Sequence, residues 1–99
     1  MNITKTLNDK ELVITLDGRL DTTTAPVLET EMQSACEGVE SLVLDLKDLV
    51  YISSAGLRVI LSTQKRMAKQ GSMKIVHVTK AVMDIFTMTG FASIIRIEA

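Results

Sequence analysis

The chain has 99 residues, of which 46% are hydrophobic and 23% are charged, and its formal net charge is −1. This length and balance predict one globular domain, spanning residues 1–99, with a modest core. Lysines and arginines are scattered, and one tyrosine and two phenylalanines are the whole aromatic set. The basic stripe with stacking aromatics that nucleic-acid binding needs is missing, so we expect no direct nucleic-acid partner.

The predicted location follows from apolar runs and cysteine usage. No run is long enough to span a membrane, and residues 1–10 lack the apolar core of a signal peptide. The single cysteine, Cys36, has no partner for an internal disulfide, which fits a reducing compartment. We therefore expect a cytoplasmic protein that makes no direct contact with a membrane.

The first part of the chain predicts a β-hairpin followed by a helix. Residues 2–7 form a weaker strand pattern and residues 11–17 a stronger one, rich in Leu, Val and Ile. In the helix that follows, threonines at 22–24 offer an N-cap, Pro26 suits the first turn and Gly38 ends it. One face of this helix is apolar and carries Leu28, Met32, Ala35 and Cys36. A buried, inert thiol is favoured for Cys36, because no histidine or second cysteine is near it in sequence.

The rest of the chain predicts three more strands and two more helices. The strands are expected at residues 42–46, 72–78 and 93–98. The helices are expected at residues 55–70 and 80–90, with Gly71 and Gly90 as their stops. Within the longer helix, residues 55–70, the residues that recur at helical spacing are Leu57, Ile60, Leu61, Gln64, Met67 and Ala68.

The resulting order, β-β-α-β-α-β-α-β, predicts an α/β fold. Each strand-helix-strand step favours a right-handed parallel crossover, whereas the opening hairpin is antiparallel. We expect a small mixed sheet of about five strands, with about three helices packed mainly on one face.

The sequence gives little support to catalysis. Ser54 lies between a strand and a helix, as a hydrolase nucleophile does, but that motif needs glycine where Ile52 stands. The one histidine, His77, falls within a predicted strand, where a structural role is favoured over that of a general base. One histidine and one cysteine make no metal cluster, and no phosphate-binding loop is present. We therefore expect no enzyme activity, no metal and no cofactor.

Two serines in "YISSAGLRVIL", residues 51–61, mark the junction between an apolar strand and an apolar helix. A serine hydroxyl at a helix start can cap unsatisfied backbone N–H groups. The same helix end also stabilises negative charge, so the fold would tolerate a phosphate on Ser54. We expect Ser54 to cap the helix and to be available for phosphorylation.

Four segments carry a resemblance to a known family. They are "GRLDTTTAP" at 18–26, "LVLDLKDLVYISSAGLRVI" at 42–60, Gly71 before "MKIVHV", and "IFTMTGF" at 85–91. Together they resemble the STAS domain, which is named for sulfate transporters and anti-sigma factor antagonists. The resemblance covers nearly the whole chain and is strongest to the stand-alone bacterial anti-sigma factor antagonists.

The resemblance implies a partner-switching function. In that family the unphosphorylated protein binds an anti-sigma factor, itself a serine kinase, and so releases the sigma factor. The kinase then phosphorylates a helix-start serine, and a serine phosphatase reverses this. That serine falls on Ser54; the family often has Asp before it, where this chain has Ser53, a second candidate acceptor. The resemblance implies partner-binding roles for Asp21, Ser53, Ser54 and Gly56, although Asp21 is equally well interpreted as a turn or cap residue.

A second interpretation belongs to another class of protein. Some small STAS proteins are constitutive adaptor subunits of a larger assembly, such as a membrane lipid-transport ATPase, and have no phosphorylation cycle. The sequence leaves this alternative open.

Overall fold

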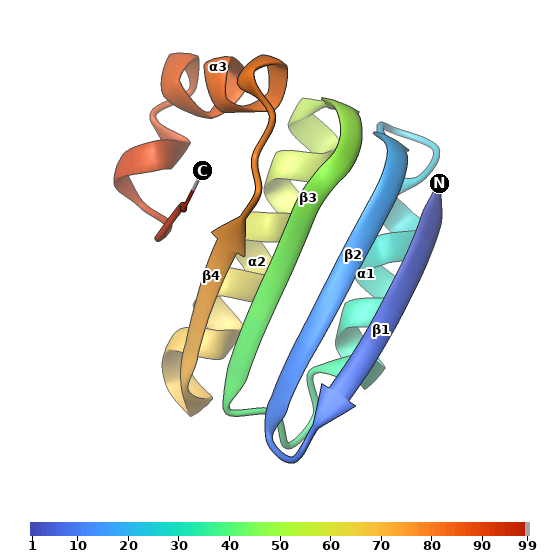
Figure 1. Cartoon of the computed structure of the whole chain (residues 1–99), viewed down its shortest axis with the longest axis vertical. Helices are drawn as coiled ribbons and strands as arrows, with labels where there is room; N and C mark the ends of the chain where they lie inside the picture. The colour runs from blue at the N-terminus through green and yellow to red at the C-terminus, as the bar shows by residue number, and fades with distance from the viewer. Residues whose placement is uncertain (99) are drawn as a thin grey trace.

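A computed structural model describes residues 1–98 of the chain (Figure 1). Four strands, three α-helices and one short 3-10 helix alternate along it. In chain order they are β1 (Asn2–Asn8), β2 (Glu11–Leu20), α1 (Ala25–Ala35), β3 (Ser41–Ile52), α2 (Ser54–Gln70), β4 (Ser72–Val76), α3 (Lys80–Met88) and η1 (Phe91–Ser93).

The strands form one mixed sheet in the order β1-β2-β3-β4. The β1–β2 hairpin is antiparallel, and β2, β3 and β4 run parallel to one another. Helices α1 and α2 lie side by side on one face of the sheet, while α3 sits beyond the ends of β3 and β4 (Figure 1). The predicted fold class, a small mixed sheet with three helices mainly on one side, is confirmed.

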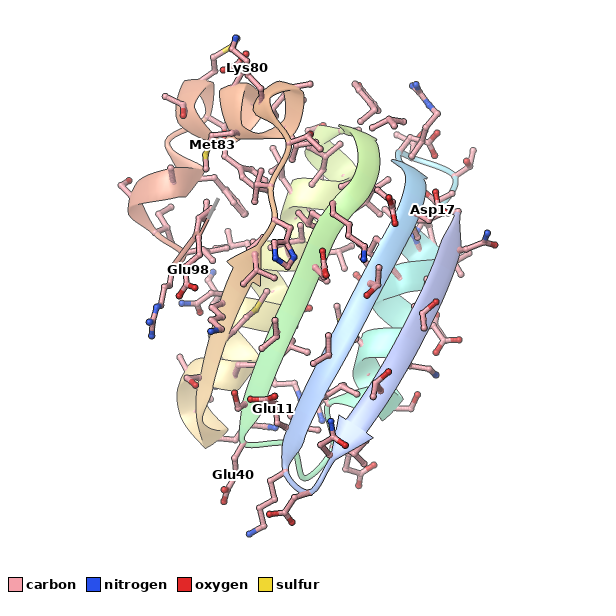
Figure 2. All side chains as sticks on the ribbon, in the orientation of Figure 1. Glu11, Asp17, Glu40, Lys80, Met83 and Glu98 are labelled. Atoms are coloured by element: carbon pink, nitrogen blue, oxygen red, sulfur yellow. The ribbon has the colours of Figure 1, made fainter. Side chains whose placement is uncertain are left out.

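The alternating pattern of β2 explains how the sheet binds its helices. Leu12, Ile14 and Leu16 are buried beneath the helical layer, whereas Glu11 and Asp17 stand on the uncovered face (Figure 2). A strand directs successive side chains to opposite faces, so one apolar face is enough to hold α1 and α2. From α2 the core receives Leu57, Ile60 and Met67, as the helical spacing predicts; Leu61 and Gln64 are only partly buried and Ala68 is exposed.

The predicted last strand at residues 93–98 is wrong as a full element. Ser93 ends the 3-10 helix, and a single bridge between Ile75 and Ile97 is what remains of strand pairing there. The sheet therefore has four strands within the described residues, rather than about five. The aromatic rings of Phe86 and Phe91 stack with centroids 5.8 Å apart. This buried pair packs η1 against α3, so residues 91–93 form a 3-10 turn where the strand was expected to begin.

Other strand ends also differ from the prediction, by one residue at Asn8 and Ser41 and by more at the ends of β2, β3 and β4. β2 continues to Leu20 and β3 to Ile52, because these two residues are paired and buried. β4 stops earlier than expected, at Val76, because His77 has a left-handed backbone with φ of 56°. His77 thus lies outside the strand and is mostly exposed, with its Nδ1 3.1 Å from a carboxylate oxygen of Asp45.

Candidate functional site

The carboxyl ends of β2 and β3 bring the predicted site residues together. Leu20 and Ile52 are partners in the parallel ladder, and the N–H of Ser53 donates to the carbonyl of Leu20 at 2.8 Å. Asp21 directly follows β2 and Ser53 directly follows β3, so the two residues lie side by side at one edge of the sheet. In an open α/β sheet this edge is where binding residues gather, since the loops there are free of the ladder.

The carboxylate of Asp21 organises the turn that leads into α1. Its Oδ1 accepts hydrogen bonds from the backbone N–H groups of Thr23, at 3.0 Å, and Thr24, at 3.1 Å, and from the Thr23 hydroxyl at 2.7 Å. The Thr24 hydroxyl accepts from the Asp21 N–H and makes no capping bond to α1. These hydrogen bonds, led by that of the Thr23 hydroxyl, lower the pKa of Asp21 to about 2. The turn interpretation of Asp21 therefore has direct structural support, while its predicted partner contact stays a prediction.

Ser53 and Ser54 have different places at the start of α2. The Ser53 Oγ accepts a hydrogen bond from the N–H of Gly56 at 3.3 Å, and its backbone is extended, as in an N-cap. Ser54 is the first helical residue and is exposed. The expectation that Ser54 caps the helix is wrong, because the capping geometry needs the extended residue one position earlier. Ser54 is left with a solvent-facing hydroxyl at the positive end of the helix dipole.

Gly56 lets the start of α2 approach the strand ends closely. It is buried, and a Cβ added to it would lie 2.6 Å from Cγ of Leu20 and 3.0 Å from Cγ1 of Ile52. Real Cβ atoms do not come this close, so a larger residue would push the helix start away from the sheet. Any role of Gly56 in partner binding is therefore indirect: it fixes where Ser53 and Ser54 lie.

Arg19 and Tyr51 flank this edge. The sequence alone did not indicate a role for either residue. The guanidinium of Arg19 lies over the ring of Tyr51, 4.4 Å from the centroid. Its Nε is 3.8 Å from an Asp21 carboxylate oxygen, a half-exposed contact that contributes little to stability. Arg19 and Tyr51 are register partners in β2 and β3, so the pairing of the two strand ends was the signal needed to find them.

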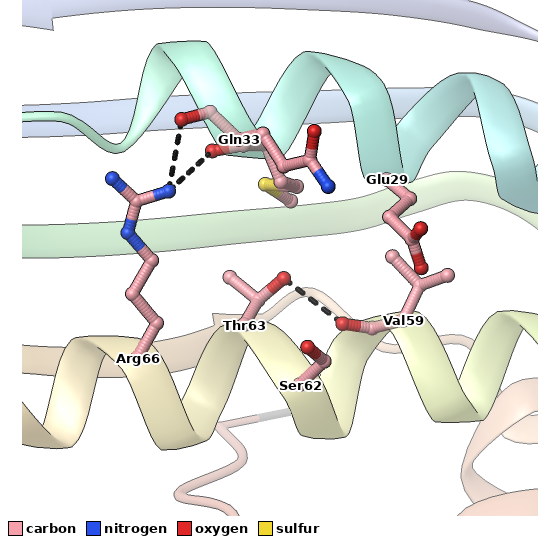
Figure 3. Close-up of a pocket in the computed structure, with 7 residues that line it drawn as sticks. Glu29, Gln33, Val59, Ser62, Thr63 and Arg66 are labelled. Atoms are coloured by element: carbon pink, nitrogen blue, oxygen red, sulfur yellow. Dashed lines mark hydrogen bonds between the residues drawn. The ribbon is translucent and has the colours of Figure 1, made fainter.

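A groove runs between α1 and α2 on the outer surface of the helical layer. One part of it, about 220 Å³, lies between Met32 and Gln33 on α1 and Val59 and Thr63 on α2 (Figure 3). Arg66 closes this part at one end by donating to the carbonyls of Gln33 and Met32, at 2.9 and 3.4 Å. The bond to Gln33 provides a donor for a carbonyl at the end of α1, and the two bonds together tie α1 to α2.

A second hollow of about 180 Å³ opens at the other end of this groove, next to Ser54. We call it the Ala55 cleft, after a residue that lines it and follows Ser54 directly. Both hollows share Glu29 and Val59 in their linings. Arg58, which is exposed, stands on the α2 side of the Ala55 cleft, and no ion pair within residues 1–98 involves it.

Other chemistry-bearing residues lie apart from this edge. Cys36 is fully buried, and this burial raises the pKa of its thiol despite a smaller opposite effect of Arg66, as an inert core cysteine requires. In the part of the chain that the structure describes, no three His, Cys, Asp or Glu side chains come together in a way that could hold a metal ion. Within the same described residues, no helix is both long enough and apolar enough to cross a membrane.

Comparisons with known proteins match the chain over nearly its whole length. The family model described as "STAS domain" matches residues 2–99. The Anti-sigma-B factor antagonist of Bacillus subtilis (strain 168) is 32% identical over 100 residues, which cover 100% of this chain and 92% of that protein.

Two solved structures share the fold. An anti-sigma factor antagonist from Mycobacterium paratuberculosis superposes with a TM-score of 0.89 at 22% identity, covering 98% of this chain and 84% of that one. The structure of the Bacillus cell fate determinant SpoIIAA in its phosphorylated form superposes with a TM-score of 0.75 at 17% identity. The superposition covers 99% of this chain and 91% of that one.

Proposed function

Because the chain belongs to the STAS domain family, we propose that it is a cytoplasmic anti-sigma factor antagonist switched by phosphorylation of Ser54. The unmodified chain binds an anti-sigma factor that is a serine kinase, and this binding releases the sigma factor. Phosphorylation of Ser54 by that kinase ends the binding, and a serine phosphatase restores it. The relative in Bacillus subtilis, matched over the whole chain, bears the name of such an antagonist and supports this choice of class.

The observation that carries the proposal is the separation of Ser53 from Ser54. Ser53 is partly buried and its hydroxyl already accepts a hydrogen bond from the N–H of Gly56, so a phosphate there would have to fit around an existing structural contact. Ser54 is exposed and its hydroxyl is outside that bond. A phosphate on Ser54 adds charge at the positive end of α2 without breaking a structural contact. Ser53 remains the lesser candidate acceptor.

The switch works through a difference between the free and bound states. In the free protein the phosphate is hydrated and is stabilised by the helix start. In the complex it must be desolvated against a surface shaped for a hydroxyl, and an unpaired interfacial charge is costly. A tenfold loss of affinity needs a difference of only about 1.4 kcal/mol. Asp21 and Ser53, side by side with Ser54 at the same edge, complete the contact surface.

Binding measurements on three versions of the chain test this function. We expect the wild type and Ser54→Ala to bind the cognate anti-sigma factor with similar affinity in calorimetry. Ser54→Asp should fold normally but bind at least tenfold more weakly. Equal affinities for all three would argue against a switch at Ser54 and favour the constitutive adaptor interpretation.

A further inference from the structure

The Ala55 cleft is continuous with the proposed contact surface. Thr22, which directly follows Asp21, lies at one side of its mouth, and Ala55, which directly follows Ser54, lies at the other. A partner that covers Asp21 and Ser54 would therefore lie next to residues that line the cleft.

The lining of the Ala55 cleft indicates what can enter it. Ala25, Pro26, Ala55 and Val59 present carbon atoms, and small residues on both helices leave the space between them open. Its volume of about 180 Å³ is below the roughly 300–1,000 Å³ of sites that hold small molecules. A single aliphatic side chain fits such a space, and burying one gives an interface its anchor.

The rim adds a charge preference. Arg58 is exposed on the α2 side of the mouth, one helical turn beyond Ser54. The first turn of α2 holds no acidic residue, and the helix dipole adds positive potential at the same place. Glu29 lies on the α1 side of the cleft, but it forms no ion pair with Arg58 in the described chain. Arg58 is therefore free to pair with a carboxylate of the partner.

We propose that the Ala55 cleft receives an aliphatic side chain of the anti-sigma factor, and that Arg58 pairs with a carboxylate next to it. This inference rests on the proposed function, because it takes the anti-sigma factor as the occupant. It extends the interface from the strand ends onto the helical layer, and this added part depends on a small residue at position 55 and on a cation at position 58.

Two pairs of matched variants test the inference, with calorimetric titration of the purified cognate anti-sigma factor as the readout. Ala55→Leu fills the cleft and should weaken binding at least tenfold. Ala68→Leu makes the same change on the exposed surface of α2 and should leave affinity within twofold. Arg58→Glu should also weaken binding at least tenfold. Lys65→Glu makes the same change in charge about 10 Å further along α2 and should have an effect below threefold.

The outcomes separate the inference from the function on which it rests. Wild-type binding that is lost in Ser54→Asp, together with unchanged binding by Ala55→Leu and Arg58→Glu, would overturn the inference alone. A wild-type chain that binds no anti-sigma factor would overturn both. If Ala55→Leu proved unfolded by circular dichroism, Arg58→Glu would decide, because its side chain is exposed. A change in self-association of Ala55→Leu, measured by sedimentation, with unchanged binding of the anti-sigma factor would identify a second copy as the occupant and contradict the proposal.

Discussion

The hydroxyl of Ser53 accepts a hydrogen bond from the N–H of Gly56 at 3.3 Å, and this contact fixes the first turn of α2. Gly56 is itself buried against Leu20 and Ile52, so the cap is joined directly to the ends of β2 and β3. Ser54 lies between the two partners and is exposed. The helix start is thus fixed by the neighbours of Ser54, while Ser54 itself is exposed to solvent.

The division of roles between the serines predicts unequal effects on stability. Ser53→Ala should lower the free energy of unfolding by about 1 kcal/mol, since it removes an N-cap. Ser54→Ala should change it by less than about 0.5 kcal/mol, as is usual for an exposed position. Urea unfolding followed by circular dichroism measures both. Ser53→Asp is the control that keeps a capping oxygen, and a larger loss from Ser54→Ala than from Ser53→Ala would refute the assignment of the cap.

The tight packing of Gly56 predicts that Gly56→Ala destabilises the fold, although alanine is the better helix former. Crowding against the fully buried Leu20 should outweigh the helix propensity of alanine, for a net loss of about 1–2 kcal/mol in the free energy of unfolding. A double-mutant cycle with Leu20→Ala checks the cause. In the Leu20→Ala background, Gly56→Ala should lower the free energy of unfolding by less, because the Leu20 carbons that crowd the new Cβ are absent. An unchanged loss would mean that the strain arises from another contact.

The carboxylate of Asp21 predicts a pH-dependent part of the stability. Its pKa is about 2 in the folded chain and near 3.8 in an unperturbed one, so folding favours the ionised form. This contribution is fully present above about pH 4 and is lost as the pH falls through about 2. Asp21→Asn should therefore be less stable than the wild type near neutral pH, and the difference should shrink towards pH 2 in acid-series urea unfolding. A difference that is constant with pH would mean that the charge of Asp21 makes no contribution.

The full burial of Cys36 predicts that its thiol reacts only when the chain opens. Ellman's reagent should modify the native protein at least tenfold more slowly than the urea-unfolded protein, because the thiol is inaccessible and its pKa is raised. Equal rates in the two states would show that the end of α1 is open in solution.

Much of this fold could be predicted from local pattern alone. The apolar alternation of β2 and the helical spacing of α2 are properties of neighbouring residues, so their existence and faces were predictable. The junction of β3 and α2 was equally clear, because two serines and a glycine interrupt two apolar runs.

What could not be predicted depends on contacts between distant segments. The extension of β2 and β3 follows from pairing of Leu20 with Ile52, and the 3-10 turn at the start of the expected last strand accompanies the packing of Phe91 on Phe86. The cap could not be assigned between Ser53 and Ser54 because both have the same side chain. Only the backbone angles at the junction distinguish them. The Ala55 cleft requires the relative placement of α1 and α2, which no single segment encodes.

Site-resolved mass spectrometry of the chain, after incubation with its cognate anti-sigma factor kinase and ATP, is the most direct test of the switch at Ser54. We expect one phosphate per chain, on Ser54, and none in the Ser54→Ala variant, which should still bind the kinase. A chain that binds the kinase but carries no phosphate, or carries it on Ser53 alone, would contradict the switch proposed here.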